Sequence, residues 1–277
     1  IDESQYQQVF DLGWYENYSL TDDSPCTKVC NCLREVFGIQ PDPDLLRYKI
    51  HVSPDSQRVA GEYLHRVCNG RKLGERYPAV AIHYQGNTSA EKKNLAHEDV
   101  KLLCQELIRG GYVPVILDWD HRSPLPDQQT IFCPDADTRD LWHNTGTGDA
   151  EQLAALISQC TLMVGVDSGP LHVAGATDTP TLACWIGHAP VQFFDLCPNV
   201  LHLVPEDWRA IPPFQNPNAI RYFEKNYRFE TCRGFRQALV HHALRLLGPL
   251  QERPDEGLEF CSGFWVRKDN VEQDLVI

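Results

Sequence analysis

The sequence lacks several features that would define a function class. No run of about 18 apolar residues is present, so we expect no transmembrane helix. No signal peptide is visible, although the chain starts at Ile1 rather than at Met, which suggests processing or truncation. The sequence also contains no Gly-x-Ser-x-Gly nucleophile motif and no Walker phosphate-binding loop. It has no internal repeat and no low-complexity tract.

Basic residues are scarce relative to acidic ones. The 277 residues include 25 Lys and Arg against 38 Asp and Glu, which gives a formal net charge of −13. This balance argues against non-specific binding to nucleic acid or to an anionic membrane surface. A local pocket for one phosphorylated ligand remains compatible with it.

The 11 cysteines do not indicate a disulfide framework, because their number is odd and several lie in apolar segments. Cys104, Cys160 and Cys184 are examples, and we expect a cytoplasmic protein with reduced thiols. The cluster Cys26, Cys30 and Cys32 lacks the second ligand pair that zinc sites usually have. The sequence leaves open whether this cluster binds a metal.

Buried apolar runs alternate with amphipathic segments from about residue 77 onward. We expect strands at 79–83, 112–117, 131–133, 162–166, 181–186 and 200–204, and helices at 95–109, 149–159 and 234–247. A further helix is expected from 53 to about 68. This order predicts an α/β fold with a Rossmann-like, doubly wound parallel sheet.

The most informative motif spans residues 164–176, Val-Gly-Val-Asp-Ser-Gly-Pro-Leu-His-Val-Ala-Gly-Ala, and continues in a second strand that ends at Gly187. An apolar strand is followed at once by a helix whose N–H groups and dipole favour an anion. Ser168 can cap that helix, and Pro170 suits its first turn. Gly169 allows a ligand to approach the backbone closely. The pattern predicts a phosphate site, and the alternative is a strand–turn–helix without a ligand.

A polar loop follows the first expected strand of this sheet. Thr88 and Ser89 offer hydroxyl groups, and Lys93 can reach a phosphate as a point charge. The carboxyl ends of parallel strands meet at one edge, so this loop and the Asp167 motif are expected to lie together. The alternative is a solvated lysine pair on a surface loop.

Asp118, Trp119 and Asp120 follow the next expected strand. An acidic residue at this place commonly binds ribose hydroxyls in Rossmann-like sheets, and Trp119 could stack on a base. A charged surface loop is the equal alternative.

The two motifs together resemble glycosyltransferase family 9, the ADP-heptose:lipopolysaccharide heptosyltransferases. The resemblance implies a GT-B fold whose C-terminal domain holds the donor diphosphate. It assigns Thr88, Ser89 and Lys93 to the donor loop and His172 to the donor phosphate or sugar. Asp167 could accept a hydrogen bond from a sugar hydroxyl or from loop N–H groups. The alternatives are a turn and cap role for Asp167 and a core histidine at His172, and Leu95-Ala96 stands where the family usually has Trp-Pro.

The resemblance is convincing only from about Tyr77 to Gly187, and the glycine-rich turn that carries the family's catalytic carboxylate is missing. The expected division is therefore an incomplete N-terminal acceptor-side region at 1–72, a donor-binding domain at 73–248 and a tail at 249–277. The catalytic base stays unassigned.

The expected function is transfer of a sugar, heptose being one option, from a nucleotide-diphosphate donor to an acceptor hydroxyl. The acceptor would be a glycan, a lipid-linked glycan or a protein, and no nucleic acid is expected as a partner. We expect no cofactor or metal, because Lys93 and the helix terminus can offset the charge of the leaving diphosphate. The alternatives are a non-catalytic nucleotide-sugar-binding module or a structural subunit, with a homo-oligomer or a partner chain supplying the missing domain.

Overall fold

The computed structural model describes residues 37–40, 49–86, 89–117, 130–132, 149–194, 196–248, 258–261 and 264–267. The chain divides into two compact units, which are described separately. The larger unit comprises Tyr48–His188, Cys197–Glu206 and Arg228–Ile277. The smaller unit comprises Ile1–Arg47, Ala189–Leu196 and Asp207–Tyr227.

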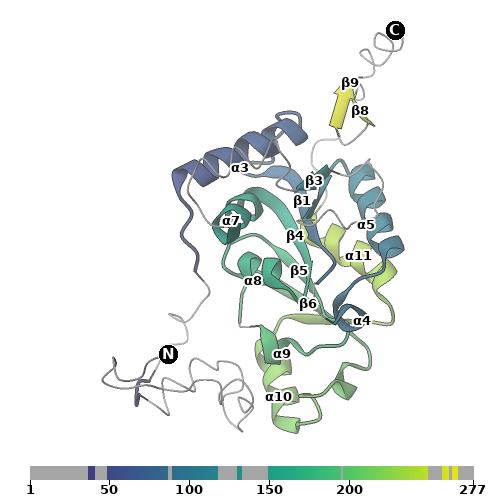
Figure 1. Ribbon diagram of the computed structural model, residues 1–277. Helices are drawn as coiled ribbons and strands as arrows, with labels where there is room; N and C mark the ends of the chain where they lie inside the picture. The colour runs from purple at the N-terminus through teal and green to yellow at the C-terminus, as the bar shows by residue number, and fades with distance from the viewer. Residues whose placement is uncertain are drawn as a thin grey trace. The chain divides into compact units, whose positions relative to one another are not determined.

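A sheet of seven parallel strands forms the centre of the larger unit (Figure 1). The strand order is β3-β2-β1-β4-β5-β6-β7, so the order reverses between β1 and β4. This arrangement confirms the predicted α/β, Rossmann-like class and places a topological switch point next to the phosphate motif. The strands are β1 Tyr77–His83, β2 Val113–Leu117, β3 Thr130–Phe132, β4 Cys160–Val166, β5 Thr181–Cys184, β6 Val200–Pro205 and β7 Phe229–Cys232.

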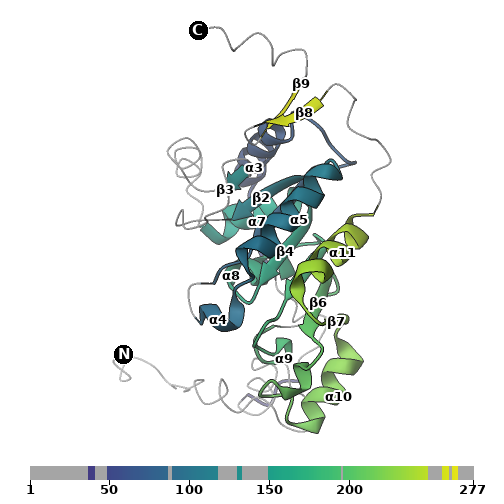
Figure 2. The ribbon, with the colours of Figure 1, turned by 90° about the vertical axis from the view of Figure 1, so that its right-hand side faces the viewer.

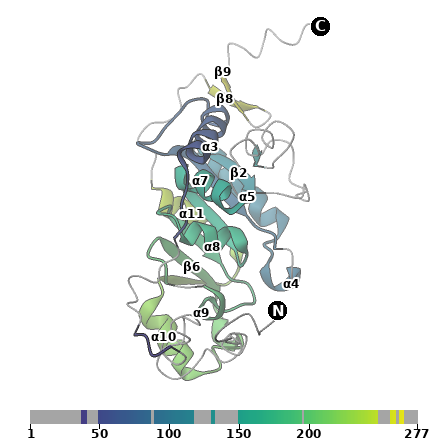
Figure 3. The ribbon, with the colours of Figure 1, turned by 60° about the vertical axis from the view of Figure 1, so that its left-hand side comes forward.

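Alternate residues of the central strands point to opposite sides of this sheet, and on both sides these residues are apolar. Helices therefore cover both faces of the sheet. In β1, Ala79 and Ala81 belong to one core cluster, whereas Val80 and Ile82 belong to the other. Figure 2 shows two helices side by side on one face, and Figure 3 brings those of the other face forward. The first face carries α5 His97–Arg109 and α11 Phe235–Leu247, and the second carries α3 Pro54–Val67, α7 Asp149–Gln159 and α8 Gly169–Gly175.

Helix α3 packs in the core of the larger unit rather than apart from it. Its apolar residues Val59, Leu64 and Val67 are buried with residues of α7 and β1. The division predicted from the sequence places these residues on the N-terminal side of a boundary at residue 72. The packing assigns α3 to the sheet, and the rest of the predicted division stays a prediction.

Three cysteines in apolar segments are residues of the hydrophobic core. Cys104, Cys160 and Cys184 are fully buried with free thiols, as their setting in apolar segments predicted. Burial raises the pKa of the Cys104 thiol to about 12, which makes this group unreactive near neutral pH.

Several elements differ from the sequence-based expectation. Strand β7 lies beyond 200–204, which the sequence indicated as the last strand. The tail contains a two-stranded antiparallel sheet of β8 Leu258–Cys261 and β9 Phe264–Arg267. A further helix, α10 Pro217–Asn226, lies before β7 and is not among the helices predicted from the sequence.

The smaller unit has an aromatic core of its own. Trp208, at the start of the 3-10 helix η3 Trp208–Ala210, lies 4.6 Å from Phe214 and 5.1 Å from Phe223, measured between ring centroids. All three side chains are nearly fully buried. A further short helix, α9 Pro190–Phe193, completes the helices described in this unit. Within the described part of the chain, no helix is both long and apolar enough to cross a membrane.

Candidate functional site

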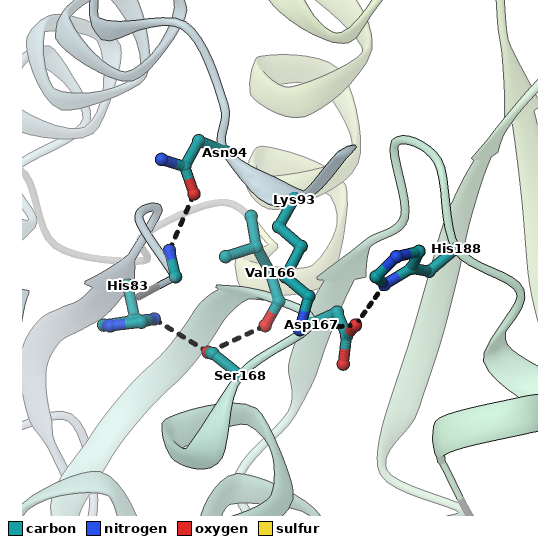
Figure 4. Close-up of polar contacts among 8 residues, drawn as sticks. His83, Lys93, Asn94, Val166, Asp167, Ser168 and His188 are labelled. Carbon is teal, nitrogen blue, oxygen red and sulfur yellow. Dashed lines mark hydrogen bonds and ion pairs between the residues drawn. The ribbon is translucent and has the colours of Figure 1, made fainter. Parts of the chain in front are cut away.

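The predicted phosphate motif and the lysine loop meet at the carboxyl edge of the sheet (Figure 4). Asp167 follows β4 directly, and Lys93 ends the one-turn helix α4 Ala90–Lys93 that follows β1. β1 and β4 are hydrogen-bonded neighbours, with Ile82 opposite Val164. The pairing of these two strands therefore brings the two sequence motifs together.

Lys93 and Asp167 form an ion pair. The distance from Lys93 Nζ to Asp167 Oδ2 is 3.2 Å, and the two side chains are only 17% and 7% exposed. A pair that is this shielded from water interacts more strongly than a surface salt bridge. This contact rules out a fully solvated Lys93.

His188 provides a second partner for the same carboxylate. Its Nδ1 lies 2.7 Å from Asp167 Oδ2. A carboxylate accepts hydrogen bonds, so Nδ1 carries the proton in this contact. The loop after β5 places His188 beside Asp167, because β5 pairs with β4.

Ser168 does not cap the helix with its side chain, contrary to the sequence-based expectation. It occupies the N-cap position of α8, but no side-chain cap hydrogen bond forms. Its hydroxyl donates to Val166 O at 2.9 Å and lies 2.8 Å from His83 Nδ1. The oxygen that would accept a helix N–H is thus engaged by the His83 ring. Pro170 stands in the first turn of α8, as predicted.

Two glycines allow α4 to approach the strand ends closely. A Cβ at Gly187 would lie 3.1 Å from Lys92 Cβ, and Gly187 N donates to Lys92 O at 2.9 Å. A Cβ at Gly86 would lie 3.3 Å from Lys93 Cδ. The Gly86 N–H donates to Asn94 Oδ1 at 2.7 Å, which closes the loop around α4. These contacts fix the position from which Lys93 reaches Asp167.

Ser89 and Gly169 lie at the starts of the two helices. Ser89 is the N-cap of α4 and has a left-handed backbone, with φ 52° and ψ 51°, which is uncommon for a residue other than glycine. Its side chain makes no cap hydrogen bond. A Cβ at Gly169 would meet no atom within 4 Å, so the backbone of this residue is open to a ligand.

His172 lies within electrostatic range of the ion pair. Burial lowers the pKa of its imidazole, Lys93 lowers it further, and the Asp167 carboxylate opposes both effects. The neutral ring is therefore favoured near neutral pH.

Four predicted site residues lie outside the described part of the chain. They are Thr88, Asp118, Trp119 and Asp120. The cluster Cys26, Cys30 and Cys32 also lies outside it. Among the residues that the structure describes, no group of three or more His, Cys, Asp or Glu side chains is arranged to hold a metal ion.

Sequence reasoning missed His83, Asn94 and His188 as members of the site. His83 is the last residue of β1, and His188 follows β5 by four positions. Both are polar residues at carboxyl ends of the strands that flank β4. That position in a parallel sheet is the signal that could have identified them.

Sequence comparison relates part of this chain to a known family. Residues 145–218 match the sequence profile of Glycosyltransferase family 9 (heptosyltransferase). Lipopolysaccharide heptosyltransferase 2 of Salmonella typhimurium is 26% identical over 182 residues, which cover 63% of this chain and 46% of that protein.

One solved structure shares the fold, and a second is similar at a lower score. The family 9 glycosyltransferase of Veillonella parvula superposes with a TM-score of 0.50 and 18% identity, over 72% of this chain and 53% of that chain. The E. coli ADP-heptose lps heptosyltransferase II gives a TM-score of 0.41 at 19% identity, over 63% and 54% of the two chains.

The matches identify a glycosyltransferase family 9 domain in this chain and confirm the resemblance drawn from its motifs. The chain spans about half the length of the relatives that it matches.

Proposed function

We propose that this chain binds the diphosphate of a nucleotide-sugar donor and takes part in transferring the sugar to an acceptor hydroxyl. The observation that carries the proposal is the ion pair between Lys93 and Asp167 at the switch point of the sheet. Two distant loops deliver a lysine ammonium, a carboxylate and an open glycine backbone to one edge. This is the place where open α/β sheets bind their ligands.

The chemistry expected of the site is stabilisation of the leaving diphosphate. Transfer places negative charge on the phosphate oxygen that leaves the sugar, and a nearby ammonium stabilises that charge. Lys93 supplies the ammonium. Ser168 and Gly169 directly follow Asp167, the ion-pair partner of Lys93. Among the described residues, the ion pair and the histidine contact of Asp167 both use Oδ2, and we propose that Oδ1 accepts a hydrogen bond from a sugar hydroxyl. We propose this binding role for Asp167 rather than a role as catalytic base.

The relatives point to the sugar. One curated relative is named lipopolysaccharide heptosyltransferase 2, and one solved structure is described as an ADP-heptose heptosyltransferase. Heptose and an adenine base are therefore the first donor components to test. The acceptor is proposed only as a hydroxyl group of a glycan, a lipid-linked glycan or a protein.

The first test is calorimetric titration of this chain with ADP, UDP, GDP and an ADP-sugar. Lys93→Ala should weaken binding of the preferred nucleotide about 10–100-fold, because a charge-assisted hydrogen bond is lost. Lys92→Ala is the matched control, since Lys92 is the exposed neighbour on the same helix. Equal effects of the two substitutions, or no binding of any nucleotide, would contradict the proposal.

A second arm separates transfer from binding. Release of free nucleotide or sugar transfer from the bound donor would indicate a transferase, whereas binding without turnover would favour the binding-module alternative. The titration repeated in EDTA should give the same affinity, because the proposed charge compensation uses Lys93 rather than a metal.

A further inference from the structure

Asp167 Oδ2 contacts two side chains from different segments of the chain, through a hydrogen bond with His188 and an ion pair with Lys93. His188 Nδ1 makes the shorter contact, at 2.7 Å, and Lys93 Nζ makes the longer one, at 3.2 Å (Figure 4). A lysine that both neutralises a carboxylate and binds a phosphate must divide its hydrogen bonds between them. The second donor therefore matters most when the lysine turns to a ligand.

When Lys93 turns from Asp167 to a ligand, the Asp167 carboxylate loses one of its two partners. Its side chain is 7% exposed, so a carboxylate left without a hydrogen-bond donor there would be strongly unfavourable. Without His188, Lys93 would be held to Asp167 by this cost. With His188 in place, the carboxylate keeps a donor when Lys93 departs.

The backbone couples the two donors. Gly187 N donates to Lys92 O, so the residues before His188 and before Lys93 are joined by a hydrogen bond. A Cβ at Gly187 would press on Lys92, so the close approach depends on glycine. His188 is thus fixed relative to α4 by the same contact that fixes Lys93.

We propose that His188 is a positioning residue that holds Asp167 and thereby frees the Lys93 ammonium for a phosphate ligand. The inference rests on the proposed function, since it assumes that Lys93 binds an anion. His188 itself acts through Asp167 and needs no contact with the ligand. Its ring donates from Nδ1, and an asparagine amide can place a donor at the same distance along the side chain.

The test is a double-mutant cycle on nucleotide affinity. His188→Ala should weaken binding of the preferred nucleoside diphosphate about 10-fold, because Asp167 then retains Lys93. In an Asp167→Asn background the same substitution should change affinity less than about twofold, since no carboxylate holds the lysine. His188→Asn should restore most of the affinity. Equal losses in both backgrounds, or no rescue by asparagine, would overturn the proposal.

A second readout does not depend on nucleotide binding. Acylation of lysines by a succinimidyl ester, followed by peptide mass spectrometry, compares Lys93 with the adjacent Lys92. His188→Ala should slow acylation of Lys93 relative to Lys92 about threefold or more, because Lys93 is held more tightly by Asp167. If the ratio of the Lys93 to the Lys92 acylation rate is unchanged, the proposal is overturned. If this ratio falls in a chain that binds no nucleotide, the coupling between His188 and Lys93 is supported, whereas the proposed donor site is refuted. Thermal unfolding of each variant checks that the fold is retained.

Discussion

At the scale of single residues, the charge of His172 should respond to a bound ligand. Burial keeps its pKa below the ordinary value, and the adjacent Lys93 acts in the same direction. A bound diphosphate would bring negative charge to the same place and raise the pKa of the imidazole. Binding would then be accompanied by proton uptake.

The sign of the resulting pH dependence follows from linkage. Because the pKa is higher in the complex than in the free chain, nucleotide affinity attributable to His172 should increase as pH falls through the pKa of the complex, and should level off below the pKa of the free chain. The gain approaches about tenfold for each unit by which the ligand raises the pKa. Titration calorimetry in buffers of different ionisation enthalpy measures the proton uptake directly. His172→Gln should abolish this component, and an unchanged pH profile in that variant would contradict the assignment.

At the scale of elements, α4 is a helix of one turn whose place depends on the loops around it. None of its residues is buried, so its own packing contributes little to its position. The Gly187–Lys92 hydrogen bond and the close approaches at Gly86 and Gly187 position it instead. A substitution at Gly187 should therefore displace Lys93 without contacting its side chain directly.

Gly187→Ala tests this dependence. Its new Cβ would lie 3.1 Å from Lys92 Cβ and 3.3 Å from Lys92 Cα, so α4 must move. We expect a loss of about 1–3 kcal/mol in the free energy of unfolding and weaker nucleotide binding. Gly234→Ala is the matched control, because a Cβ there meets no atom within 4 Å. Urea unfolding and calorimetry of both variants give the comparison, and similar behaviour of the two would argue against the steric account.

Some strands and helices could be predicted from the sequence, and others could not. The strands around β1 and β4 were predictable because buried apolar runs alternate with amphipathic helices. Strand β7 was missed because Phe229–Cys232 is a short edge strand with a polar centre and only one buried residue. Helix α4 is too short to show a helical period.

Likewise, some contacts of the site could be predicted from the sequence, and others could not. Lys93 and Asp167 were predicted to meet because their motifs follow neighbouring parallel strands. His188 could not be predicted from its segment alone, since its contact depends on how the loop after β5 folds back over the end of β4. The role of Ser168 was partly wrong, because the capping preference of serine is local and the competing contact with His83 comes from another strand.

At the scale of the whole molecule, a buried histidine links stability to pH. His202 in β6 is 1% exposed, and its Nδ1 accepts a hydrogen bond from Trp185 Nε1 at 3.0 Å. Burial lowers the pKa of His202 to about 3 from its ordinary value of 6.5. The unfolded chain therefore binds a proton between these two values that the folded chain does not.

Stability should consequently rise with pH in that interval and be lost as pH falls below 6.5. Between pH 6 and pH 4 we expect His202 to contribute a decrease of about 1.4 kcal/mol per pH unit in the free energy of unfolding. Urea unfolding at pH 7, 6, 5 and 4 measures the slope. His202→Asn keeps an acceptor for Trp185 but cannot titrate, so its slope should be smaller even if its stability at pH 7 is lower. An equal slope in both proteins would show that other groups dominate acid unfolding.

The strand order also affects how the chain folds during synthesis. β1 lies at the centre of the sheet, yet its partner β4 follows about 80 residues later in the sequence. At ordinary rates of translation, roughly 4–16 s pass between the emergence of the two strands. One edge of an apolar strand stays unpaired for that time, and such edges are prone to aggregation. The contact between Lys93 and Asp167 forms only after this pairing, so binding of a nucleotide at the proposed site could stabilise the chain only once β4 has emerged.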